Sequence, residues 1–134
     1  MATVSLAPNV VGNSTNGRPL LVPTALKAAE ELEKEGISCE VIDPRTLVPL
    51  DIETIVSSVA RTGRAMIVHE AVRTAGAGSE IAARIQEEAF FSLDAPVYRL
   101  GAIDTPIPQD PELEQLCIPT IDNIVAAAEE LARL

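Results

Sequence analysis

The chain has 134 residues, 47% of them hydrophobic and 22% charged, which is the composition of one folded domain rather than a disordered protein. Twenty acidic against ten basic residues give a net charge of −10, which disfavours binding to nucleic acid or to an anionic membrane. No apolar run is long enough to span a membrane, and the first residues lack a signal-peptide pattern. We therefore expect a cytoplasmic protein, or a mitochondrial matrix protein if the source is eukaryotic.

Residues 1–23 form a segment that differs in pattern from the rest of the chain. Either Val4 to Leu6 or Leu20 to Val22 could supply an opening strand. The polar stretch from Asn13 to Gly17 between them is typical of a loop. The sequence leaves both strand choices open.

From Thr24 onward, helical and strand patterns alternate. A helix is expected over residues 25–35, with Thr24 as its N-cap and Gly36 as its end. Residues 37–42 read as a strand.

A second helix is expected to begin at Asp51 and to end at Gly63, because Ile52, Ile55, Val56 and Val59 have helical spacing. Residues 65–69 are almost wholly apolar, which is typical of a strand covered on both faces.

The third helix is expected to run from an N-cap at Ser79 to about Phe91 and to precede a strand at residues 96–100. A proline-rich loop of about twenty residues then leads to a last helix that begins near Thr120. This alternation predicts a mainly parallel sheet with helices on both faces.

No catalytic, cofactor-binding or metal-binding residue is assigned from the sequence. His69 is the only histidine, and Arg73 stands where a zinc motif would place a second one, so we expect His69 to hydrogen-bond locally. Gly76 and Gly78 lack the third glycine of a dinucleotide-binding loop. A turn or a close backbone contact is the favoured explanation for both glycines.

Several motifs at consistent distances nevertheless resemble one family, the C-terminal transketolase-like domain. The likeness is closest to the beta subunit of the thiamin-diphosphate-dependent component of 2-oxo acid dehydrogenases, of the pyruvate and branched-chain types. It extends over about residues 24–130, nearly the whole chain. The motifs that carry it are Asp43-Pro44-Arg45-Thr46-Leu47-Val48-Pro49-Leu50-Asp51, Val68-His69-Glu70-Ala71, the loop from Gly76 to Glu80, Ala95-Pro96-Val97 and Asp104-Thr105-Pro106.

The resemblance implies a three-layer α/β/α domain over residues 24–134, with a mainly parallel, mixed sheet of five strands, one of them antiparallel. It also implies oxidative decarboxylation of a 2-oxo acid with acyl transfer to lipoyl. Thiamin diphosphate and Mg²⁺ would be bound by the alpha subunit and the front part of the beta subunit. We therefore expect no cofactor on this domain and no activity from the isolated chain, which would be a fragment or a truncated gene product.

The resemblance further implies an assembly role, with subunit contacts and a carboxylate-rich edge for the basic subunit-binding domain of the acyltransferase. Asp104 and the terminal carboxylate of Leu134 are the candidate partner-binding groups. Equally, Asp104 could merely begin a turn. The alternative functions are a standalone dimerisation or adaptor domain and a small-molecule-binding domain that uses the loop from Gly76 to Ser79. The oligomeric state stays open, and an exposed apolar patch left by the missing partners would favour a homodimer.

Overall fold

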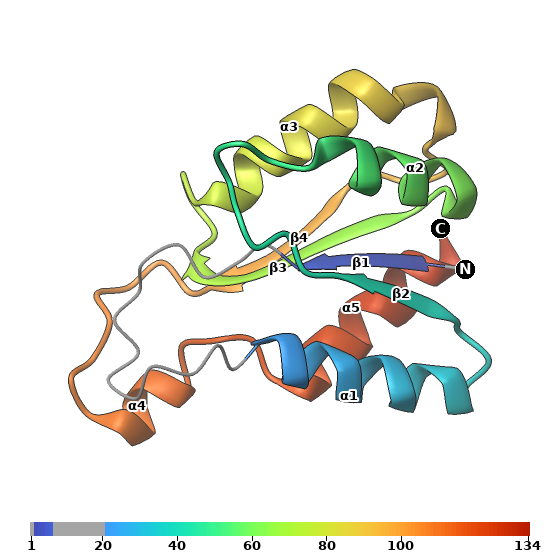
Figure 1. The fold of residues 1–134 in the computed structure, drawn as a ribbon. Coiled ribbons are helices and arrows are strands. Elements are labelled where there is room, and N and C mark those ends of the chain that lie inside the picture. The colour runs from blue at the N-terminus through green and yellow to red at the C-terminus, as the bar shows by residue number, and fades with distance from the viewer. Residues whose placement is uncertain (1, 7–20) are drawn as a thin grey trace.

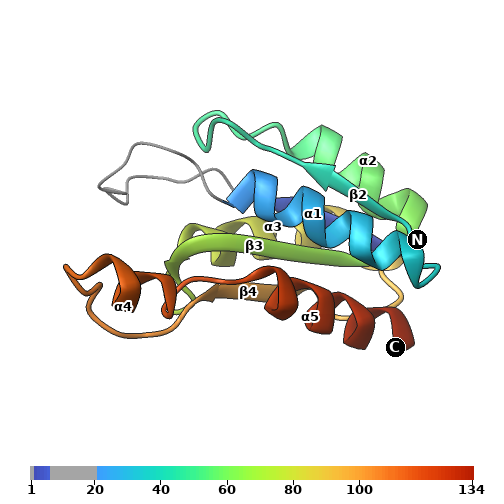
Figure 2. The same cartoon turned by 90° about the horizontal axis from the view of Figure 1, so that it is seen from below.

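The computed structural model describes residues 2–6 and 21–134, which form three layers (Figure 1). Helices α1 and α5 cover one face of the sheet and helices α2 and α3 cover the other; the view from below shows α1 and α5 side by side (Figure 2). The elements in chain order are β1 (Ala2–Leu6), α1 (Leu21–Lys34), β2 (Cys39–Ile42), α2 (Ile52–Thr62), β3 (Ala65–Val72), α3 (Ala77–Ala89), the 3₁₀ turn η1 (Phe90–Ser92), β4 (Tyr98–Ala102), α4 (Pro111–Gln115) and α5 (Ile121–Arg133).

The sheet has the strand order β2-β1-β3-β4, and every neighbouring pair is parallel. Parallel neighbours need a crossover connection, and helices supply these crossovers. The expected α/β/α layering is therefore confirmed. The expected fifth, antiparallel strand is not found among residues 2–6 and 21–134. The sheet in these residues has four strands, all parallel.

The opening strand is the earlier of the two choices that the sequence left open. β1 lies in the middle of the sheet, with Val4 opposite Val41 of β2 and Met66 of β3. Leu21 and Val22, which belonged to the other choice, lie in the first turn of α1 instead. The predicted loop from Asn13 to Gly17 lies outside the described residues.

Two predicted helix starts are wrong. α1 begins at Leu21 rather than after Thr24, since Pro23 falls in the first helical turn, where a missing backbone N–H removes no hydrogen bond. α3 is capped by Gly76 and not by Ser79. The Ser79 hydroxyl is instead the partner of Arg99, whose Nη1 lies 2.5 Å from it.

The capping residues predicted for α2 and α5 are confirmed. The Asp51 side chain accepts a hydrogen bond from the backbone N–H of Thr54, and Gly63 ends α2 in the left-handed conformation with φ +70°. Thr120 forms a reciprocal capping box with Asn123 at the start of α5. α4 was not predicted; it occupies part of the expected loop and is capped by Asp110.

The side chains of β3 divide the core into two parts. Met66 and Val68 pack on the side of α1 and α5, whereas Ala65 and Ile67 pack on the side of α2 and α3. All four are fully buried, as expected for a strand covered on both faces. The next residue that points to the α2–α3 side is His69, so the alternation along β3 carries the histidine under α3. No helix in the described part of the chain has the length and apolar character needed to cross a membrane.

Candidate functional site

His69 lies in a cage made by three glycines. Its side chain is 3% exposed. A Cβ atom built on Gly78 would lie 2.5 Å from His69 Nε2, and one built on either Gly76 or Gly101 would lie 2.9 Å from His69 Cε1. The expected close backbone contact at the glycine loop is therefore confirmed, and it explains why glycine stands at these positions.

The surroundings of His69 disfavour protonation of its ring. Burial lowers its pKa below the usual value, and the nearby charge of Arg99 lowers the pKa further, while the Ala71 backbone opposes the shift. Neither ring nitrogen has a hydrogen bond of ordinary geometry among residues 2–6 and 21–134. The expected local hydrogen bond therefore lacks ordinary geometry, although the Ala71 backbone still acts on the ring and opposes the pKa shift.

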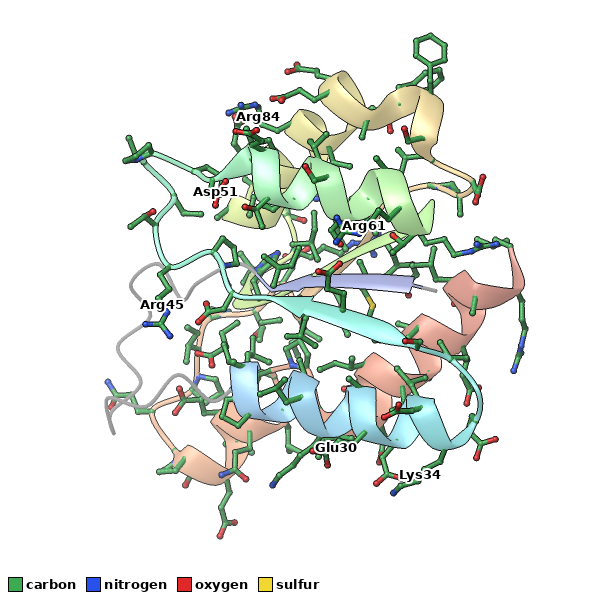
Figure 3. All side chains as sticks on the ribbon, turned by 45° about the vertical axis from the view of Figure 1, so that its right-hand side comes forward. Glu30, Lys34, Arg45, Asp51, Arg61 and Arg84 are labelled. Carbon is green, nitrogen blue, oxygen red and sulfur yellow. The ribbon has the colours of Figure 1, made fainter. Side chains whose placement is uncertain are left out.

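Several charged side chains form local ion pairs on the surface of the described helices. Figure 3 shows Lys34 on α1, Arg61 on α2 and Arg84 on α3. Lys34 Nζ lies 2.7 Å from Glu31, and Arg84 Nη2 lies 2.8 Å from Glu88. Pairs of this kind contribute little to stability. Within the described ranges, no three His, Cys, Asp or Glu residues are grouped so that they could hold a metal ion.

Asp104 joins two loops at the carboxyl end of the sheet. Its carboxylate accepts hydrogen bonds from the Thr74 hydroxyl at 2.6 Å and from the Thr74 backbone N–H at 3.2 Å. These bonds hold the pKa of Asp104 below its usual value. The side chain remains exposed to solvent, so it fixes the loop after β3 to the loop after β4 without being buried.

Leu134 lies at the opposite end of the sheet. α5 runs back from the carboxyl ends of the strands, so the C-terminus lies beside the start of β1 (Figure 1). Leu134 is 66% exposed. The two predicted partner-binding residues, Asp104 and Leu134, are therefore not brought together by the fold.

Asp94, which the sequence analysis did not single out, is linked to the last turn of α5 through Arg64. Its Oδ2 lies 3.7 Å from Arg64 Nη1, and Arg64 Nε donates a hydrogen bond to the Leu131 carbonyl at 3.1 Å. The Asp94 side chain covers Gly63, where a Cβ atom would lie 2.1 Å from Oδ2. No local pattern marks this contact, because it joins three segments that only the fold brings together.

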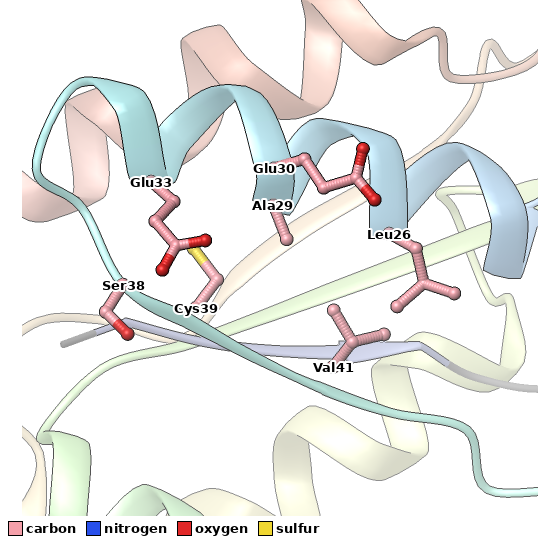
Figure 4. Close-up of a pocket in the computed structure, with 7 residues that line it drawn as sticks. All are labelled: Leu26, Ala29, Glu30, Glu33, Ser38, Cys39 and Val41. Atoms are coloured by element: carbon pink, nitrogen blue, oxygen red, sulfur yellow. The ribbon is translucent and has the colours of Figure 1, made fainter.

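A pocket of about 280 Å³ lies between α1 and β2, on the face that α1 covers. Figure 4 shows its lining: Leu26, Ala29, Glu30, Glu33, Ser38, Cys39 and Val41. The lining is mixed, with aliphatic side chains and two carboxylates. It contains none of the residues that the sequence analysis proposed.

Comparison with known proteins places the chain within a family. Residues 20–124 match the sequence model of the transketolase C-terminal domain. Over 110 residues, the chain is 47% identical to the pyruvate dehydrogenase E1 component subunit beta of Staphylococcus aureus strain Mu50, which covers 82% of this chain and 34% of that protein. The corresponding Staphylococcus epidermidis strain RP62A subunit is 49% identical over 109 residues, or 81% of this chain and 33% of that protein.

A solved structure agrees with these sequence matches. It is described as a split gene transketolase, an inactive beta4 tetramer, and it superposes on 99% of this chain with a TM-score of 0.77 and 28% identity. The match covers 40% of that chain. The resemblance predicted from the sequence motifs is thereby confirmed, and the present chain spans about a third of the length of the curated relatives.

Proposed function

This chain belongs to the transketolase C-terminal domain family, and from that membership we propose that it serves as a non-catalytic assembly domain of the beta subunit of a 2-oxo acid dehydrogenase. The observation that carries the proposal is the likeness to the two staphylococcal E1 beta subunits. In this proposal residues 24–134 make contacts with other subunits and with the acyltransferase core, and residues 1–23 are a divergent segment that supplies strand β1 and the first turn of α1 to the same domain.

The chemistry is proposed for the assembled enzyme and not for this chain. The reaction would be oxidative decarboxylation of pyruvate or a branched-chain 2-oxo acid, followed by acyl transfer to lipoyl, in the cytoplasm. Thiamin diphosphate and Mg²⁺ would be bound by the alpha subunit and by the front part of the beta subunit. The enclosure of His69 by glycine backbone supports this placement, because a substrate could not reach the ring.

The contact for the basic subunit-binding domain is proposed to include the terminal carboxylate of Leu134 and one aspartate, either Asp104 or Asp94. The geometry favours Asp94. It lies beside Arg64, which is bonded to the Leu131 carbonyl in the last turn of α5, so Asp94 lies at the same end of the sheet as the C-terminus. Asp104 is bonded to Thr74 at the other end of the sheet, where it would form a separate contact.

Titration of the acyltransferase's subunit-binding domain by calorimetry, at low and moderate salt, tests this proposal. We expect saturable, salt-sensitive binding that weakens roughly tenfold in D94N and also when two glycines are appended after Leu134. If only D104N weakens binding, the contact for the subunit-binding domain lies at the carboxyl end of the sheet. Absence of saturable binding in the unaltered chain would remove the assembly role.

A turnover assay tests the non-catalytic part of the proposal separately. The chain is supplied with pyruvate, thiamin diphosphate, Mg²⁺ and an artificial electron acceptor. No consumption is expected without the alpha subunit and the remainder of the beta subunit. Sustained consumption by the chain alone would contradict the proposal, whatever the result of the titration.

The second candidate is a standalone dimerisation domain, and exposed apolar side chains between β4 and α5 favour it. Ile107 is 59% exposed and Leu116 is 76% exposed, and both lie on the segment that carries α4. Exposed apolar patches often mark protein interfaces. Sedimentation equilibrium decides this point: a dimer that the Leu116→Ser substitution dissociates would support the second candidate.

A further inference from the structure

The outer edge of the four-residue strand β2 is unpaired in the described part of the chain. β2 stands at the end of the strand order and pairs with β1 on one side only. All four of its residues are half-buried, whereas the first five residues of β3 are buried. An open edge presents a row of backbone N–H and C=O groups, which can pair with another extended segment.

One face of this edge strand is already filled. Glu40 points to the α2 side, where it accepts hydrogen bonds from Ser58 and Arg61, the Arg61 Nη2 lying 2.8 Å from Oε2. Ile42 packs into the core beneath α2 and α3. A side chain that joins the sheet edge from outside therefore finds no cavity on the α2 side of the strand.

The other face is hollow. Cys39 and Val41 point to the α1 side, where they line the pocket of about 280 Å³ together with Leu26 (Figure 4). Leu26 is 48% exposed, although it lies on the helix face that turns toward the sheet. An edge that offers both a row of backbone groups and an adjacent side-chain pocket matches the way in which peptides are bound by strand addition.

The charge of the pocket indicates what it would accept. Glu30 and Glu33 lie one turn apart on α1, and Figure 4 shows both on the helix side of the pocket. Neither forms an ion pair with any residue that the structure describes, whereas their neighbour Glu31 is paired with Lys34. A lysine or arginine could place its aliphatic stem on Leu26 and Val41 and its charged head between the two carboxylates.

We propose that the α1–β2 groove, made of the β2 edge and this pocket, binds an extended basic segment of a partner protein that pairs with β2 and inserts a lysine or arginine between Glu30 and Glu33. A partner of positive charge is favoured over a second copy of this chain, because each copy carries a net charge of −10. The groove lies beside α1, apart from Asp94 and Asp104, so the inference does not rest on the assembly role proposed above.

Two synthetic peptides that share the same alternation of apolar and charged residues, but carry charges of opposite sign, test the proposal. One alternates valine with lysine over nine residues, and the other alternates valine with glutamate. The full chain is titrated with each, and amide hydrogen exchange and thiol alkylation are followed. We expect the lysine peptide alone to slow exchange at Cys39–Ile42 and to protect the Cys39 thiol, with Cys117 as the unprotected internal reference.

A pair of matched variants separates a specific groove from general charge attraction. E30Q/E33Q removes two charges from the pocket, and E53Q/E87Q removes two exposed charges from α2 and α3 on the other face of the sheet. We expect the lysine peptide to bind roughly tenfold more weakly to E30Q/E33Q and almost unchanged to E53Q/E87Q.

Three results would overturn the proposal. The first is an equal loss of affinity for the lysine peptide in E30Q/E33Q and E53Q/E87Q. The second is that the lysine peptide fails to slow amide exchange at Cys39–Ile42, whether or not it binds the chain. The third is that all β2 amides are already protected from exchange before any peptide is added. If sedimentation then shows a dimer, the β2 edge pairs with a second copy of the chain. If it shows a monomer, the edge pairs with another segment of the same chain.

Discussion

The glycine cage around His69 makes a quantitative prediction about packing. In Gly78→Ala, the new methyl carbon would lie 2.5 Å from both Cδ2 and Nε2 of His69 and 3.2 Å from Ile67 Cγ2. Ordinary contacts begin near 3.4 Å, so the ring or the first turn of α3 must shift by roughly 1 Å. Overpacking of this kind costs about 1–3 kcal/mol. The higher helix propensity of alanine would return about 0.5–1 kcal/mol of that cost.

Removing the ring should relieve the clash. His69→Ala alone leaves a cavity and is expected to cost about 2 kcal/mol or more. In the double variant Gly78→Ala/His69→Ala, the methyl group of the new alanine at position 78 occupies part of the space that the imidazole vacated. We therefore expect the double variant to be more stable than the sum of the two single changes implies, with a coupling energy of about 1–2 kcal/mol.

Urea unfolding followed by far-UV circular dichroism measures these free energies, since the chain has no tryptophan and one tyrosine. Gly36→Ala is the matched control. Its φ is +80° and nothing lies within 4 Å of its Cβ position, so its cost of about 1 kcal/mol comes from backbone strain alone. That cost should be the same with or without His69. Strict additivity of Gly78→Ala and His69→Ala would refute the cage.

Three further predictions concern titration and capping. Because the pKa of His69 is lower in the folded chain, the unfolded chain takes up a proton first as the pH falls below about 6.5, and the free energy of unfolding should decrease between pH 7.5 and 5.5. Urea titrations should show that His69→Gln loses this decrease. The same dependence of the free energy on pH in His69→Gln would contradict the prediction. Thr74→Val should raise the pKa of Asp104 toward its usual value, as followed by carboxyl carbon NMR, whereas Thr74→Ser should not. Thr120→Ala should cost about 1 kcal/mol in thermal unfolding and Thr120→Ser much less, since serine keeps the capping hydroxyl; equal losses would refute the capping box.

Local signals in the sequence predicted the parts of the fold that depend on local chemistry. Asp51, Gly63 and Thr120 mark helix ends because their side chain or backbone satisfies groups within one turn. Gly76 and not Ser79 is the cap of α3, and the serine hydroxyl is instead bonded to Arg99, a side chain from β4. That contact spans 20 residues, so no local pattern could reveal it.

The candidate contact surface was harder to predict for the same reason. Asp104 belongs to a family motif about thirty residues before the chain end. The sequence does not show that α5 runs back along the sheet and so places Leu134 at the opposite end from Asp104. Asp94 stands outside every cap and charge pattern, and its nearness to Arg64 depends on two loops that meet at the amino end of the sheet. The pocket beside β2 depends on which strand lies at the sheet edge, and helical or strand periodicity does not fix that order.

The central position of β1 has a consequence for how the chain reaches its native state. This strand is synthesised before both of its neighbours, β2 and β3, which follow α1 and α2. During translation it must wait without a partner until at least one crossover has emerged from the ribosome. Pairings this distant in sequence slow folding and leave an unprotected strand open to association with other nascent chains.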